Sequence, residues 1–378
     1  MSLQTDNSSL DWVALSFVTG VGSRTAAMLI DRFGSPTACF EASRTALESF
    51  GLKREVIEAI KSPAPRERAR QQLEDVARIS GEVVVLEDER YPPLLRETYD
   101  PPVVLYARGD LARALAQPAV AIVGSRHCST YGRNVAEMLS RELSQRGVTV
   151  VSGLARGVDS AAHQGALEGG GLTVAVMGTG LDTIYPKENR RLADRIAEQG
   201  ALVTEFPLDT PPLPQNFPFR NRVISGLSLG VLVVEGAERS GSLITARMAY
   251  EQGREVFAVP GNITSSKSFG PNNLIKDGGK LVQTWRDIVE EFPVELKAAI
   301  FSSERVEKPP EQLSIDEVAL SDSERRLLGL LKEDAPVHID ELITSAELST
   351  GELMGALLRL EMIDRVRQLP GKSFIRKL

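Results

Sequence analysis

Residues 119–126 read Ala119-Val-Ala-Ile-Val-Gly-Ser-Arg126, five apolar residues that pass directly into glycine, serine and arginine. Apolar side chains on successive residues are typical of a strand covered on both faces. A helical pattern begins near Tyr131, so the segment predicts a strand, a tight turn and a helix start. Such a turn attracts anions through free backbone N–H groups and the helix dipole.

Each polar residue of this turn suits a phosphate group. Gly124 lets a ligand approach the backbone, Ser125 offers a hydroxyl donor, and Arg126 offers a guanidinium fork. The alternative is that Gly124 only satisfies the backbone geometry of a strand-to-helix turn.

The same strand–glycine–helix pattern recurs along the middle of the chain. Strand–helix alternation at this spacing predicts an α/β fold with a parallel, doubly wound sheet. The six expected strands are Ala119–Val123, Val148–Val151, Thr173–Met177, Leu202–Thr204, Val231–Val234 and Val256–Val259.

Two common nucleotide motifs are absent. No G-x-G-x-x-G string follows the first strand, and Gly178-Thr-Gly180 has Thr183 where the last glycine is required. The Gly124–Thr130 loop lacks the glycine–lysine–serine/threonine ending of a Walker A loop. We therefore expect no NAD, ATP or other cofactor.

Composition narrows the class of protein. The 378 residues carry a net charge of −7, which argues against a uniformly basic nucleic-acid binder. Residues 210–286 nevertheless hold nine Lys/Arg and five Asp/Glu, a local excess typical of a backbone-binding groove. No apolar run is long enough for a membrane span, and Cys39 and Cys128 form no zinc or disulfide framework. These features predict a cytoplasmic protein without membrane contact.

More polar residues follow later strands, at the sheet edge where ligands of α/β proteins bind. Arginines two residues apart beside phenylalanines suit both phosphate contacts and base stacking. The alternative, which the spacing leaves equally open, is that Arg220 and Arg222 pair with Glu205 or Glu235 in structural salt bridges. The residues concerned are Lys187, Phe217, Arg220, Asn221, Arg222, Ser240, Gly241 and Ser242.

Catalytic signals are weak. Ser240-Gly241-Ser242 lacks the G-x-S-x-G pattern of a nucleophile elbow. We interpret His163 as a helix-packing residue rather than a general base, and Asp159 as a cap of the helix after Gly157. Asp182 and Glu235 have no sequence partner that indicates a nucleophile or metal.

Several motifs occur together and in one order, and with them the chain resembles the DNA-processing protein A (DprA/Smf) family. The resemblance is dense from about residue 90 to 285 and weaker outside. Its segments are Val123–Arg126, Ser152–Asp159 with Ala162-His163, Tyr185–Asn189, Phe217–Arg222, Ser240–Ala246, Val259–Gly261 and Asn273–Ile275.

The resemblance implies an extended Rossmann-like fold, a homodimer formed through that domain, and a pocket for single-stranded DNA. It also implies a non-enzymatic role in natural transformation, in which the DNA-bound protein loads the RecA recombinase and displaces single-strand-binding protein. Carried onto this chain, Gly124, Ser125 and Arg126 hold one phosphate, while Arg222 and Lys187 hold its neighbours.

The resemblance further implies a stacking face on Phe217 and backbone donors at Gly241 and Ser242. We include Arg220, Asn221 and Ser240 in the expected DNA-binding set. The family usually has glycine–alanine where this chain reads Gly278-Gly279-Lys280, and the extra Lys280 either extends the basic rim or faces solvent.

An enzyme is the competing hypothesis. Phosphoribohydrolases with a related fold bind a nucleoside monophosphate near the same loops, but they carry a P-G-G-x-G-T string with a nearby glutamate. The corresponding helix start here reads Arg239-Ser-Gly-Ser-Leu-Ile-Thr245, without that string.

The chain ends predict two smaller domains. Residues 1–90 indicate a helical domain whose Val18–Arg24 turn is similar to a helix-hairpin-helix, and we favour a packing role over DNA contact. Residues 91–292 form the Rossmann-like domain and 293–320 a linker. Residues 321–378 resemble a winged helix, whose presumed recognition helix Ser349–Arg359 carries one basic side chain, so a protein contact is favoured over base reading. Duplex DNA regulation through this domain is a weaker alternative.

Overall fold

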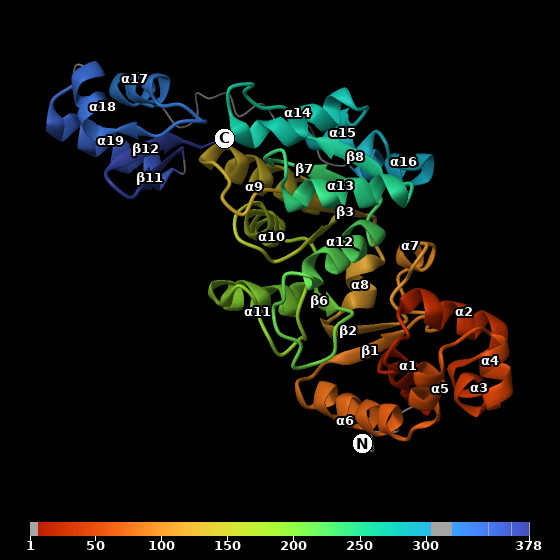
Figure 1. The fold of residues 1–378 in the computed structure, drawn as a ribbon. Helices are drawn as coiled ribbons and strands as arrows, with labels where there is room; N and C mark the ends of the chain where they lie inside the picture. Colours follow the sequence, from red (N-terminus) through yellow and green to blue (C-terminus); the bar gives the residue numbers. More distant parts are fainter. Residues whose placement is uncertain (1–6, 304–319, 347, 364, 378) are drawn as a thin grey trace.

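The computed structural model describes residues 7–303, 320–346, 348–363 and 365–377. N-terminal helices pack beside one large sheet, and a small C-terminal domain lies at the other end of the molecule (Figure 1). Within these ranges no helix combines the length and apolar character that crossing a bilayer requires.

Six short helices build the N-terminal part. Serine side chains begin two of them, since Ser35 accepts a hydrogen bond from the Ala38 amide and Ser43 from the Ala46 amide. Trp12, Leu15 and Leu29 form part of their shared core. The helices are α1 (Asn7–Ser16), α2 (Ser23–Phe33), α3 (Pro36–Glu41), α4 (Arg44–Ser49), α5 (Arg54–Lys61) and α6 (Ala64–Arg78).

A nine-stranded sheet with the order β1-β2-β6-β5-β4-β3-β7-β8-β9 forms the centre of the molecule. The seven strands from β6 to β9 run parallel, whereas β2 is antiparallel to β6 and β1 to β2. The strands are β1 (Glu82–Val85), β2 (Val104–Gly109), β3 (Ala119–Val123), β4 (Thr149–Ser152), β5 (Thr173–Val176), β6 (Ala201–Thr204), β7 (Gly230–Val233), β8 (Glu255–Ala258) and β9 (Lys280–Leu281).

Helices cover both faces of the parallel part, which confirms the doubly wound α/β prediction. On one face the apolar core includes side chains of α8 (Leu111–Leu115), α12 (Asn216–Gly226) and α13 (Gly241–Glu251). On the other it includes α9 (Thr130–Gln145), α10 (Val158–Glu168) and α15 (Trp285–Val289). The remaining elements here are α7 (Pro93–Arg96), η1 (Lys187–Asn189), α11 (Arg190–Gln199), η2 (Ser266–Ser268) and α14 (Phe269–Lys276).

The predicted domain boundaries need two corrections. The edge strand β1 lies before residue 90, and the core of the N-terminal helices continues into Tyr106 of β2, so helices and sheet are not separated at that residue. The first part of the predicted linker forms α16 (Val294–Ser303), whose Ile300 is buried against the sheet core. The rest of the predicted linker, residues 304–319, lies outside the described residues.

The C-terminal domain has the predicted winged-helix fold. Capping boxes at Ser321 and Ser349 begin its first and third helices. Its elements are α17 (Asp322–Leu330), β10 (Val337–His338), α18 (Ile339–Ser345), α19 (Thr350–Met362), β11 (Val366–Leu369) and β12 (Ser373–Arg376). The wing contacts α9 through Arg367 Nη2, which lies 3.3 Å from Glu137 Oε2.

Candidate nucleic-acid interface

A pocket of about 420 Å³ lies where the strand order of the sheet reverses. From β3 the chain proceeds to β4, β5 and β6 on one side, and then returns to β7 on the other. Residues that follow β3 and β7 line the pocket, together with side chains of α10, α12 and α13. This is the place where open α/β sheets hold ligands.

The start of α13 supplies backbone donors to the pocket. Its N-cap Ser240 makes no side-chain capping bond, because its hydroxyl oxygen lies 2.7 Å from that of Ser242. Within the described residues, the amides of Gly241 and Ser242 have no acceptor, as expected for the first turn of a helix. The eleven-residue helix therefore presents free N–H groups and the positive end of its dipole to the pocket.

Arg220 of α12 places a buried cation in the pocket wall. The residue is 4% exposed, its Nη1 donates to the Val176 carbonyl at 3.0 Å, and its Nε has no partner. Among the described residues no carboxylate lies within 4 Å of its guanidinium. Burial lowers the pKa of Arg220 to about 10, an effect that the charge of Asp159 partly offsets, so the side chain is charged at neutral pH.

Asp159 holds the loop behind this arginine. The carboxylate accepts hydrogen bonds from the amides of Gly153 (3.1 Å) and Ala155 (3.3 Å). Burial raises the pKa of Asp159, while Arg220 and the two amides act in the opposite direction. Asp159 is the second residue of α10, whose N-cap is Gly157, so its carboxylate orders the preceding loop rather than capping the helix. The sequence did not predict Asp159 as a pocket residue.

Arg126 and Phe217 form the mouth of the pocket. Arg126 is exposed, and its Cζ lies 5.1 Å from the centre of the Phe217 ring. Tyr185, 45% exposed, packs against the same ring with 5.9 Å between ring centres. No described carboxylate pairs with Arg126 within salt-bridge distance. The mouth thus combines an available cation with aromatic surface, and sequence reasoning included Tyr185 only as part of a motif.

The turn after β3 differs from expectation in one respect. Ser129 caps α9, and its amide and hydroxyl both donate to the buried carboxylate of Glu235. The N-terminus of α9 is therefore already neutralised by a side chain of the protein, and the prediction of an anion site at that helix start is wrong. Gly124, Ser125 and Arg126 still line the pocket, but its helix terminus belongs to α13.

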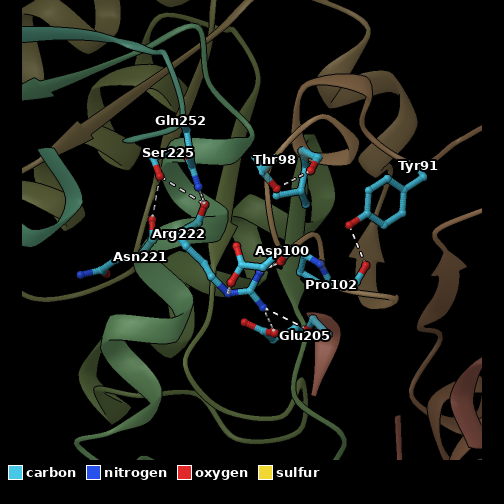
Figure 2. A network of polar contacts seen from close by, with 11 residues as sticks. Tyr91, Thr98, Asp100, Pro102, Glu205, Asn221, Arg222, Ser225 and Gln252 are labelled. Carbon is cyan, nitrogen blue, oxygen red and sulfur yellow. Dashed lines mark hydrogen bonds and ion pairs between the residues drawn. The ribbon is translucent and has the colours of Figure 1, made fainter. Parts of the chain in front are cut away.

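Arg222 does not face the pocket. Residues two apart on an α-helix project about 200° from each other, so Arg222 lies on the side of α12 opposite Arg220. Its guanidinium binds the Glu205 carboxylate and the Asp100 carbonyl oxygen, and its Nε is 3.6 Å from Asp100 Oδ2 (Figure 2). Arg222 is 7% exposed, so the structural salt bridge that the sequence left open is the correct alternative, with Glu205 as its carboxylate.

Two lysines that were expected to bind DNA also lie outside the pocket lining. Lys280 Nζ is 2.7 Å from Glu291 Oε1 and 3.8 Å from Glu290 Oε2, so it pairs with acids at the sheet edge instead of extending a basic rim. Lys187 is exposed at the start of η1, next to Pro186, which lines a second small cavity beside Arg126 and Arg156. The structure thus brings nine of the twelve predicted site residues to one pocket: Gly124, Ser125, Arg126, Phe217, Arg220, Asn221, Ser240, Gly241 and Ser242.

The remaining residues that the sequence singled out contact other parts of the protein rather than the pocket. His163 is fully buried, its Nδ1 lies 2.7 Å from Thr173 Oγ1, and burial lowers its pKa to about 3. The Val18–Arg24 turn faces the sheet, since Gly22 and Ser23 line a cavity with Glu205. In α19, Arg359 lies 3.4 Å from Glu324. Protein contact by the winged helix stays a prediction.

Comparisons with known proteins agree with this architecture. Residues 82–293 match the model of a family described as DNA recombination-mediator protein A, and residues 308–372 match that of the DprA winged helix domain. Protein Smf of Escherichia coli is 46% identical over 290 residues, which cover 76% of each chain. DNA processing protein DprA of Streptococcus pneumoniae is 48% identical over 205 residues, 54% of this chain and 72% of that one.

Two solved structures are similar as well. The crystal structure of DprA from Streptococcus pneumoniae has 37% sequence identity and a TM-score of 0.59, and the match covers 75% of this chain and 96% of that one. A structure of DNA processing protein A from Helicobacter pylori, described in terms of its single-stranded DNA binding mode, has 31% identity and a TM-score of 0.51. That match covers 56% of this chain and 94% of the other.

Proposed function

The chain belongs to the DNA recombination-mediator protein A family, and we propose that it binds single-stranded DNA without regard to sequence through the pocket at the start of α13. The observation that carries the proposal is Arg220, a buried guanidinium in the pocket wall with no carboxylate partner among the described residues. A buried cation is stable when an anion compensates it. A backbone phosphate, also bound by the free amides of Gly241 and Ser242, supplies that charge.

The mouth of the pocket explains a preference for an unpaired strand. Phe217 and Tyr185 offer aromatic surface on which any base can stack, and stacking requires bases that are free of a duplex. Arg126 lies over the same ring and binds a second phosphate. Phosphate contacts and stacking carry no base-specific hydrogen bonds, so affinity is independent of sequence.

The biological role follows from the family. We propose that the protein protects incoming single strands during natural transformation and transfers them to the RecA recombinase in exchange for single-strand-binding protein. The family description as a recombination mediator and the relatives that are DNA processing proteins support this role. Oligonucleotides coated with single-strand-binding protein should activate the RecA ATPase only when this protein is added. The Arg126→Ala variant should give less ATPase activity than the wild type.

Two further parts of the proposal concern assembly and chemistry. We propose a homodimer formed through the sheet domain, which light scattering at micromolar concentration should detect as about twice the chain mass of 41.1 kDa. We also propose binding without a chemical step, because Asp159, the carboxylate in the pocket lining, holds loop amides. Release of free base from a nucleoside monophosphate, measured by chromatography, would instead support the phosphoribohydrolase hypothesis.

Fluorescence anisotropy tests the binding proposal. Labelled oligo(dT) and a duplex of equal length are titrated with the full chain at two salt concentrations. We expect tighter binding of the single strand and a steep loss of affinity at the higher salt, because phosphate contacts release counterions. Equal affinity for both DNAs, or binding that does not respond to salt, would contradict the proposal.

A further inference from the structure

The Arg222 network joins the pocket helix to a loop of the N-terminal half. Its guanidinium binds the carbonyl oxygen of Asp100 and the carboxylate of Glu205 (Figure 2). Asp100 lies in the loop between α7 and β2, and α12 contacts both α7 and α13. The loop that carries Tyr99 and Asp100 is therefore fixed to the same helix that carries Arg220 and Phe217.

Tyr99 in this loop is exposed, although Arg222 binds the backbone of the next residue, Asp100. The side chain is 75% exposed, and the Arg24 guanidinium of α2 lies 5.1 Å from the centre of its ring. An exposed aromatic ring with a cation against it is the combination that sequence-independent single-strand binders use for a stacked base and its phosphate. Arg24 has no carboxylate partner within salt-bridge distance among the described residues.

Around the axis of α12, Phe219 projects between Arg220, which faces the pocket, and Arg222, which binds the loop. It is 58% exposed and three residues before Arg222, so both project from neighbouring positions on α12, away from Arg220. Phe217 in the pocket mouth, Phe219 on the outer side of α12, and Tyr99 beyond Arg222 thus form a series of aromatic side chains across one helix. The diameter of a helix with its side chains is about 10–12 Å, a distance that roughly three to four nucleotides span at about 3.4 Å per stacked step.

Two acidic groups near this series, Asp100 and Glu205, both face Arg222. These pairings leave Arg24 to contact a phosphate. Arg24 is the last residue of the Val18–Arg24 turn and belongs to α2.

We propose that Tyr99 and Arg24 form a second contact for single-stranded DNA, which binds the strand after it leaves the pocket and passes Phe219. The inference depends on the proposed function, because it extends the same bound strand. The ligand is one nucleobase of any type stacked on Tyr99, with a backbone phosphate on Arg24.

A length series separates the two contacts. Anisotropy titrations with oligo(dT) of increasing length are made for wild type, Tyr99→Ala, Tyr99→Phe and Arg24→Ala in the full chain. Oligonucleotides too short to extend beyond the pocket should bind all four proteins equally. For the long oligonucleotides, Tyr99→Ala should lose at least fivefold in affinity and Tyr99→Phe should retain it, because only the ring is needed.

Tyr250 of α13 provides a matched control, since it is also an exposed tyrosine, 45% exposed, but near the end of its helix that is distant from the pocket. Tyr250→Ala should bind every length as wild type does. Unchanged long-strand affinity in Tyr99→Ala, with short-strand binding intact, would overturn this inference and leave the proposed function standing. The pocket is tested separately with Arg126→Ala, which should lose affinity for the short strands. Crosslinking of 5-iodouracil oligonucleotides, mapped by mass spectrometry, should yield adducts at Tyr99 only with the long strands.

Discussion

Arg220 and Arg222 are two residues apart on α12, yet their guanidinium groups lie on opposite sides of the helix. Arg220 faces the pocket and donates to the Val176 carbonyl oxygen, whereas Arg222 binds Glu205 and the Asp100 loop. One helix therefore carries a cation that is available to a ligand and a cation that is part of the scaffold. This division gives the two residues different experimental consequences.

Replacing Arg126 should weaken DNA binding without unfolding the protein. The side chain is exposed and contacts the Phe217 ring, so Arg126→Ala removes a phosphate contact and little packing. We expect affinity to fall uniformly across sequences, and the slope of log affinity against log salt to decrease by about 1. Anisotropy titrations of oligo(dT) and mixed sequences at several salt concentrations measure both effects. An unchanged slope would remove Arg126 from the interface.

Replacing Arg222 should primarily reduce stability. The Arg222→Ala change leaves the Glu205 carboxylate buried without its cation, and breaking a buried pair in this way costs about 3–5 kcal/mol. Urea unfolding followed by circular dichroism measures the free energy of unfolding. The control is Lys280→Ala, which removes a solvent-exposed pair and should leave the midpoint unchanged. A stable Arg222→Ala protein with a reduced salt slope would show instead that Arg222 binds phosphate.

Two glycine substitutions test whether DNA binding depends on the position of the Arg220 guanidinium. A Cβ at Gly153 would lie 1.5 Å from Arg220 Nη1, so Gly153→Ala must displace the guanidinium. A Cβ at Gly355 of α19, outside the pocket, meets no atom within 4 Å, which makes Gly355→Ala a matched control. We expect a loss of oligo(dT) affinity of tenfold or more for Gly153→Ala and near wild-type binding for Gly355→Ala. Equal affinities would mean that Arg220 has no part in binding.

His163 should make the protein sensitive to acid. Burial lowers the pKa of His163 to about 3 from its ordinary 6.5, so below pH 6.5 the unfolded chain binds a proton that the folded chain does not. The free energy of unfolding therefore falls as pH decreases from 6.5 towards 3, by about 1.4 kcal/mol per pH unit for this group. Glu205, whose pKa burial raises to about 7, acts oppositely between pH 7 and its ordinary 4.5.

Comparison with a variant isolates the histidine from the other groups. The stability difference between wild type and His163→Gln should shrink by about 2 kcal/mol between pH 6.5 and pH 5, because only the wild type titrates. Urea unfolding at each pH measures it. A difference that stays constant with pH would show that His163 is protonated alike in both states.

The sequence predicted the long buried strands of this fold better than it predicted the edge strands and their pairing. Apolar runs such as Ala119–Val123 identified six strands to within one or two residues, because full burial on both faces leaves a continuous signal. The strands β1 and β2 were missed, and their antiparallel pairing has no local signature. The two-residue β9 was missed as well, since it is too short for any pattern.

The candidate site was predictable where a motif places several groups together, as in Ser240–Ser242. The spacing of Arg220 and Arg222 already excludes a common face on a helix. The sequence does not show that Glu235, which follows β7, occupies the start of α9, because its contact with Ser129 arises only in the three-dimensional arrangement. Charge alone therefore does not separate a ligand site from a structural pair.

Hydrogen exchange measured by mass spectrometry, with and without oligo(dT), tests the central claim most directly. The amides of Gly241 and Ser242 make no hydrogen bond to other described residues, so they should exchange rapidly in the free protein. We predict that bound oligo(dT) slows exchange in peptides covering 124–127 and 240–246, while residues 349–376 of the winged helix do not change. Protection confined to the winged helix, with the pocket peptides unaffected, would contradict the account.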